Sequence, residues 1–239
     1  MDTTRRAAAV AGALYLVTFV ASIPALALLG PVLDDARYVV GAGADSQVTW
    51  GAVLDLVNAA ACIGTAVALY PVLRRQNASL ALGFVTSRLM EAAIIAMGVI
   101  SLLAVVTLRQ EPPAGADDAS MVTVAAGLVA VRDWTFLLGP GLVAGVNALI
   151  LGSLMYRSGL VPRIIPVLGL VGAPLHLAAV LASVFGVNSQ TSAWSAIAVV
   201  PLFCWELSLG LWMAFKGFRA PERERFQRVH DERRELVAV

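Results

Sequence analysis

A series of long apolar runs is the feature that most constrains the fold of this chain. A helix needs about 20 predominantly apolar residues to cross the hydrocarbon core of a bilayer. Hydrophobic residues make up 59% of the sequence, against roughly 45–50% in soluble domains. We therefore predict an all-α, polytopic membrane helix bundle of about six transmembrane helices, whose apolar runs lie at 7–31, 50–73, 80–107, 134–156, 164–185 and 194–217.

Two segments lie outside these spans. Residues 119–132 are moderately apolar, follow a polar loop and end at Arg132–Asp133, a pattern that favours a short interfacial helix. Beyond residue 218 the chain is rich in charges of both signs. We divide the chain into a transmembrane bundle, 1–218, and a charged cytoplasmic tail, 219–239. The tail is either simply solvated or bound to lipid headgroups.

The distribution of basic residues predicts the orientation. Cytoplasmic loops of membrane proteins carry an excess of lysine and arginine. The set of span ends that includes both termini is the basic one, while the opposite set is mainly acidic. We therefore expect both termini in the cytoplasm, and the excess of arginine over lysine suggests a bacterial cytoplasmic (inner) membrane. The basic set is Arg5, Arg6, Arg74, Arg75, Arg157, Arg163, Lys216 and the arginine-rich tail.

Ionisable residues within spans are costly, so each of them is a functional hypothesis. Counting along the helices places Arg88, Glu91 and Glu206 near mid-span and Asp55 in the outer part of its span. Helical spacing gathers the polar and small residues of each span into one stripe. We expect these stripes to face a shared polar interior, open to the outer leaflet or outer face and closed toward the cytoplasm.

These stripes supply the candidate site residues. The candidates for a catalytic role are Glu91, Glu206, Asp133 and Arg88, and those for ligand binding are Asp55, Asn58, His176, Trp134, Trp205 and Asn147.

Structural roles are the alternative for most of these candidates. Arg88 and Glu91, three residues apart, can form a neutral pair that only fixes helix register. Asp133 can cap a helix, and His176 can be a hydrogen-bonded core residue. Glu206 has no basic neighbour in its own span, so it must pair with Arg88 or His176 or remain protonated.

Familiar motifs for cofactors are missing from the sequence. It has no phosphate loop, zinc-ligand spacing, nucleophile elbow or haem-ligating histidine pair. We predict no cofactor and no metal, and no nucleic-acid partner. The expected partners are membrane lipids and a lipophilic small molecule. Gly141 and Gly145 form a small-xxx-small pair, which usually means tight helix packing and less often a homodimer.

Several longer segments resemble a known family. VRDWTFLLGPG (131–141), NALILGSLMYRSGLVPRIIPVLGLVGAPL (147–175) and WELSLGLWMAFKGF (205–218) are similar to the bacterial domain-of-unknown-function 4386 family, and the likeness covers nearly the whole chain before the tail. The resemblance implies a multi-helix membrane protein. It implies no chemistry.

Three functions remain open at this point. The first is a membrane-embedded enzyme or binding protein for an isoprenoid-like or lipid-like molecule, in which buried carboxyl groups move protons and aromatic rings shield a developing cation. The second is a proton-coupled transporter or channel. The third is a regulatory or structural membrane partner that docks through its tail.

Overall fold

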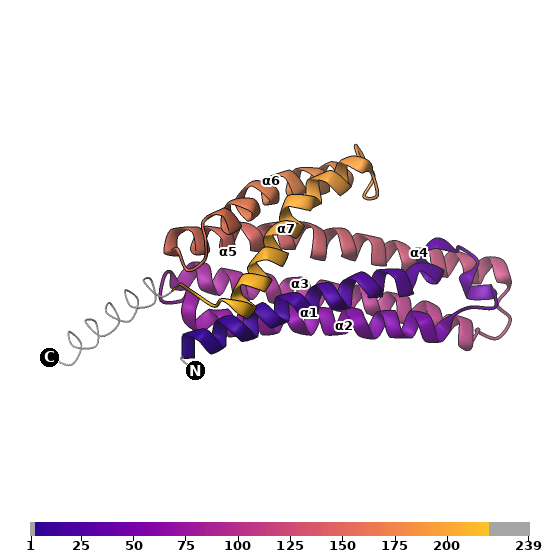
Figure 1. The fold of residues 1–239 in the computed structure, drawn as a ribbon. Coiled ribbons are helices and arrows are strands. Elements are labelled where there is room, and N and C mark those ends of the chain that lie inside the picture. The colour runs from indigo at the N-terminus through magenta and orange to yellow at the C-terminus, as the bar shows by residue number, and fades with distance from the viewer. Residues whose placement is uncertain (1–2, 220–239) are drawn as a thin grey trace.

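The computed structural model describes residues 3–219, so the tail assigned to 219–239 lies outside the described residues except for Arg219. Every regular element in this range is helical, and Figure 1 shows their arrangement. The elements are α1 (Thr3–Asp34), a 3-10 turn η1 (Tyr38–Val40), α2 (Asp45–Leu73), α3 (Ala78–Gln110), α4 (Asp118–Phe136), a π-helix η2 (Leu137–Val143), α5 (Ala144–Ser158), α6 (Ile164–Val184) and α7 (Ala193–Phe215).

Membrane-spanning capacity follows the sequence prediction. Within the described range, 6 helical stretches are long and apolar enough to cross a membrane, which confirms the all-α membrane bundle. An even number of crossings returns the chain to the side on which it began. Consistent with this, Arg5 near the start of α1 donates a hydrogen bond to the carbonyl oxygen of Lys216 just after α7.

The predicted interfacial helix at 119–132 is wrong. The helix α4 continues without a break through η2 into α5, and together they form one span of 41 residues, Asp118–Ser158. Arg132 ends the apolar pattern in the sequence, but its side chain is buried against Asp55 and does not mark a surface. At about 1.5 Å per residue this span is longer than the roughly 30 Å hydrocarbon core, so part of it extends beyond that core.

The Gly139-Pro140-Gly141 stretch produces a π-helix. Proline has no backbone N–H, so an α-helical hydrogen bond is lost at that position. The seven residues Leu137–Val143 accommodate this with wider π turns. Gly141 and Gly145 are covered by Val180 and Leu177 of α6, so this small-residue pair packs within the chain. The homodimer therefore stays a prediction.

The helices form a long bundle with a diverging hairpin (Figure 1). The helices α1, α2, α3 and the continuous α4–α5 run alongside one another. The hairpin of α6 and α7 leans away from this bundle, and α7 crosses back to pack against the first half of α1.

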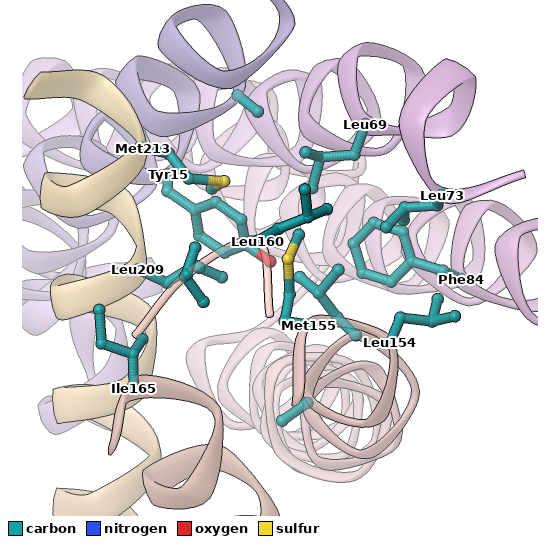
Figure 2. Close-up of a cluster of buried hydrophobic side chains, with 14 of the residues drawn as sticks. Tyr15, Leu69, Leu73, Phe84, Leu154, Met155, Leu160, Ile165, Leu209 and Met213 are labelled. Carbon is teal, nitrogen blue, oxygen red and sulfur yellow. The ribbon is translucent and has the colours of Figure 1, made fainter. Parts of the chain in front are cut away.

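Two apolar cores lie at different levels of the bundle. The larger one, drawn in part in Figure 2, includes Tyr15, Leu69, Met155, Leu209 and Met213 and occupies the end where α1 begins and α7 ends. The second occupies the opposite end and is built from Leu29, Val32, Tyr38, Val39, Val48, Leu102, Val105, Val106, Met121 and Ala125. The polar residues of the spans gather between these two cores.

Candidate functional site

A cavity of about 240 Å³ lies between the two apolar cores. Residues of α1, α2, α3, α4, η2, α5 and α7 line it, so most of the bundle contributes to its wall. Its polar lining residues are Thr18, Ser22, Asp55, Asn58, Cys62, Arg88, Glu91, Arg132, Thr135 and Glu206, and its apolar ones are Phe19, Ile23, Leu26, Ile95, Phe136, Pro140 and Ala144. The polar stripes of separate helices do converge here.

Arg88 and Glu91 form the ion pair that their spacing suggests. Arg88 Nη1 lies 2.8 Å from Glu91 Oε2, and both side chains are almost fully buried. Asn147 of α5 donates a second hydrogen bond to the same oxygen, at 2.7 Å. The guanidinium also lies over the Tyr15 ring, 5.0 Å from its centroid. Charge pairing and hydrogen bonding together satisfy the buried Glu91 carboxylate, which would otherwise be costly in this setting.

A second buried ion pair joins α2 to α4. Arg132 Nη2 lies 3.2 Å from Asp55 Oδ2, and both residues are less than a tenth exposed. The Arg132 guanidinium is also stacked on Phe136 one turn later, 4.9 Å from the ring centroid. Both residues of this pair line the cavity, as Arg88 and Glu91 do, so the cavity wall contains two ion pairs.

Glu206 is the remaining carboxyl group of the cavity. It comes from α7 and lines the cavity together with Arg88 and Glu91. Within residues 3–219, no basic side chain lies in ion-pair distance of it, since Arg88 and Arg132 are paired with Glu91 and Asp55. Glu206 is thus the acidic group that is free to interact with an occupant.

The cavity opens at the side of the bundle. Three of its lining residues are also substantially exposed on the outer surface, Ile23 at 59%, Leu26 at 54% and Phe136 at 38%. The first two belong to α1 and the third to α4, so the opening lies between these two helices. The apolar cores close both directions along the bundle axis. Access is therefore lateral, between apolar side chains exposed on the side of the bundle.

Five of the candidate residues do not line this cavity, although one of them, Asn147, holds the Glu91 carboxylate of its wall. Asp133 is exposed and lies on another face of α4 than Arg132 and Phe136, which line the cavity. Trp134 is half exposed, as an interfacial anchor would be. Trp205 is fully buried in the packing of α7 against Gly169 of α6.

His176 is the last of these residues. Its Nε2 lies 3.0 Å from the carbonyl oxygen of Gly141 in the π-helix, to which it donates a hydrogen bond. A hydrogen-bonded core role, the structural alternative raised by the sequence, accounts for this residue. Among the described residues, no group of three or more histidine, cysteine, aspartate or glutamate side chains could hold a metal ion.

Sequence reasoning missed Arg132. We assigned it to the outer surface because it ends a moderately apolar segment next to Asp133. The usable signal was the spacing of Arg132, Phe136 and Pro140 at intervals of four residues, which puts all three on the cavity face. A lone arginine in a span also requires a buried carboxylate, and Asp55 had no other partner in its own helix.

The contrast between Asp55 and Asp133 gives a direct test of this corrected assignment. Replacing Asp55 with asparagine leaves Arg132 buried without its counter-charge, which we expect to lower the free energy of unfolding by about 1–3 kcal/mol. Asp133→Asn should change it by less than about 0.5 kcal/mol, because surface substitutions have small effects. Thermal unfolding of both variants in the same detergent measures the difference. Equal losses would contradict the burial of the Asp55–Arg132 pair.

Comparison with known proteins supplies the family. A family model described as domain of unknown function (DUF4386) matches residues 10–217. The chain belongs to this family. The DUF4386 match covers all six spans except the first residues of α1, and it carries no assigned activity. No curated protein and no solved structure matches the chain.

Proposed function

We propose that this DUF4386 protein binds a lipophilic small molecule, isoprenoid-like or lipid-like, in the central cavity. The observation that carries the proposal is a single cavity with buried charges on its polar walls, apolar side chains beside them and an opening to the side of the bundle. Ligand sites in proteins commonly combine a mostly apolar lining with a few placed polar groups. A molecule dissolved in the bilayer reaches such a cavity without crossing the headgroups.

The polar groups have separate tasks in this proposal. Glu91 and Asp55 are held by Arg88 and Arg132, so they shape the polar walls without reacting. Glu206 meets the polar end of the occupant and exchanges a proton with it. A carboxyl group without an arginine partner is suited to that exchange, because it can gain or lose a proton without breaking an ion pair.

Two features favour binding or catalysis over transport. Apolar cores close the cavity along the bundle axis, toward both ends of the described helices. A carrier needs a site that opens alternately to the two sides of the membrane. Lateral entry serves a protein that takes its ligand from the bilayer and returns it there.

The location completes the proposal. We infer that the protein resides in the bacterial cytoplasmic membrane with both termini in the cytoplasm, since the basic residues lie at the end where α1 begins and α7 ends. The cavity then lies in the middle and outer half of the membrane. Its ligand would come from the outer leaflet.

A blocking variant tests the proposed binding. Ser22 lines the cavity on the α1 side of the opening, so Ser22→Phe should fill the entrance without altering any charge. Mass spectrometry of organic extracts from the purified protein should show an apolar molecule that accompanies the wild type in near-stoichiometric amount. We expect Ser22→Phe to reduce the amount of this molecule on the order of tenfold. Even a change of one methylene group in a pocket alters the free energy of binding by about 1–3 kcal/mol, and a phenyl ring is larger.

The matched control is Val20→Phe. Val20 is on the same helix, 72% exposed, and outside the cavity lining. It should keep the accompanying molecule at the wild-type level. Loss of the molecule from both variants, or from neither, would count against binding in the cavity. Uptake of a solute by proteoliposomes driven by a proton gradient would instead favour transport.

A further inference from the structure

The charges of the cavity do not balance. Two guanidinium groups and three carboxyl groups line it. Arg88 pairs with Glu91, and Arg132 pairs with Asp55. Glu206 remains, with an uncompensated negative charge whenever it is ionised. A lone charge at this depth is costly, so either a proton or a positively charged occupant must neutralise it.

The surroundings of Glu206 also favour a cation. Glu206 lines the cavity beside the Thr18 and Ser22 hydroxyl groups of α1, and no basic side chain of the described residues pairs with it. Phe19 adds an aromatic ring to the lining, whereas the Phe136 ring already stacks with the Arg132 guanidinium. Aromatic faces attract organic cations, and the attraction grows when water is excluded. An anionic occupant would meet the Glu206 carboxyl group directly.

We propose that the occupant is a lipophilic organic monocation, an amine or quaternary ammonium with an apolar body, and that it exchanges for a proton on Glu206. This inference rests on the proposed binding of a lipophilic molecule in the cavity. In the empty cavity Glu206 is a neutral carboxylic acid. When the cation enters, the O–H bond breaks, the proton leaves through the same lateral opening to the membrane–water interface, and the carboxylate pairs with the cation.

The other titratable groups near Glu206 do not supply this proton. On α3 and α2, Glu91 and Asp55 are already fixed by arginines. Tyr15 of α1 lies under the Arg88 guanidinium, and Cys62 of α2 is in contact with that guanidinium through its sulfur. His176, on α6, is turned to the Gly141 carbonyl group. Glu206 is the acid that can ionise without breaking an ion pair.

The size of the cavity limits what enters it. At about 240 Å³ it is near the lower end of ligand pockets, which span roughly 300–1,000 Å³. It accommodates the charged head and the first part of an apolar body. The remainder extends through the opening between α1 and α4, alongside Ile23 and Leu26, into the acyl chains.

Proton release provides the test. Dodecyltrimethylammonium carries no ionisable proton, so any proton released on its binding comes from the protein. We would add it to the full chain in lipid nanodiscs, in weakly buffered solution near neutral pH, and record pH and bound ligand together. Dodecanol, a neutral molecule with the same chain length, serves as the matched ligand. Protein-free nanodiscs correct for partition into lipid.

The expected result is about one proton released per bound dodecyltrimethylammonium, because a nearby opposite charge favours the ionised carboxylate. Dodecanol should bind without release. We expect the cation to bind wild type on the order of tenfold more tightly than dodecanol, and Glu206→Gln to abolish both that preference and the proton release. Asp133→Asn, which removes an exposed carboxyl group outside the cavity, should behave as wild type.

Other outcomes separate the two proposals. If dodecanol and the cation bind equally, Ser22→Phe blocks both and no proton appears, the monocation is overturned while cavity binding stands. If neither ligand binds beyond the protein-free discs, the monocation and the proposed function both fail. Proton release that persists in Glu206→Gln would overturn the assignment of the exchanging acid.

Discussion

Arg88→Ala is expected to lower the free energy of unfolding by about 3–5 kcal/mol, the range found when one partner of a buried ion pair is removed. The substitution strands the Glu91 carboxylate with only Asn147 as a partner, and it removes the cation from the Tyr15 ring. Thermal or denaturant unfolding of the purified variant in nanodiscs measures the loss.

Glu206→Gln is the control for this result. Glutamine keeps the shape of a protonated glutamate and most of its hydrogen-bonding capacity, and in the described structure no ion pair to Glu206 is broken. The expected change is below about 1 kcal/mol. Comparable losses for the two variants would mean that Glu206, too, is held in an ion pair, and the idea of a free acid would have to be abandoned.

Gly12→Leu is expected to separate α7 from α1. A Cβ atom at Gly12 would contact the backbone nitrogen of Ala214 and come within 2.7 Å of the Gly210 carbonyl oxygen, and backbone atoms cannot move aside as a flexible side chain can. Overpacking of this kind costs about 1–3 kcal/mol or more. Because Glu206 is on α7, its displacement should also abolish the proton release that accompanies cation binding.

Gly127→Leu is the matched control for Gly12→Leu. Gly127 is also within a helix, α4, but a Cβ atom there would have no neighbour within 4 Å. It should preserve both stability and ligand binding. Cross-linking between cysteines introduced on α1 and α7 reports the separation independently of activity. Unchanged cross-linking in Gly12→Leu would show that the contact between α1 and α7 tolerates the larger residue.

The helical spans could be predicted from the sequence because the bilayer restricts which backbone structures can cross it. In a bilayer, backbone polar groups must be satisfied within each segment, so an apolar run of sufficient length becomes a helix whatever surrounds it. This is why six spans could be read from the sequence before any contact was known. The error at 119–132 arose because a charged residue was read as a surface marker, although a buried partner makes the same residue compatible with a span.

Contacts within one helix of the candidate site could be predicted from the sequence, whereas contacts between helices could not. Local spacing predicts the Arg88–Glu91 pair, because residues three apart on a helix are neighbours. The partnership of Arg132 with Asp55 joins positions 77 residues apart, and that of Asn147 with Glu91 joins positions 56 apart. Helical periodicity gives the face of each residue but not the rotation or neighbour of its helix, so these partners were beyond its reach.

The sequence by itself determined the all-helical membrane bundle, the number of crossings and the presence of buried charges, because these depend on chain-local length, hydropathy and period. Only the tertiary structure decided that Arg132 belongs to the cavity and that Trp205 and His176 do not. It also left Glu206 without a counter-charge among the described residues. These outcomes depend on which helix faces meet, and that is decided by close packing at small residues such as Gly12 and Gly169 and by the wider turns around Pro140.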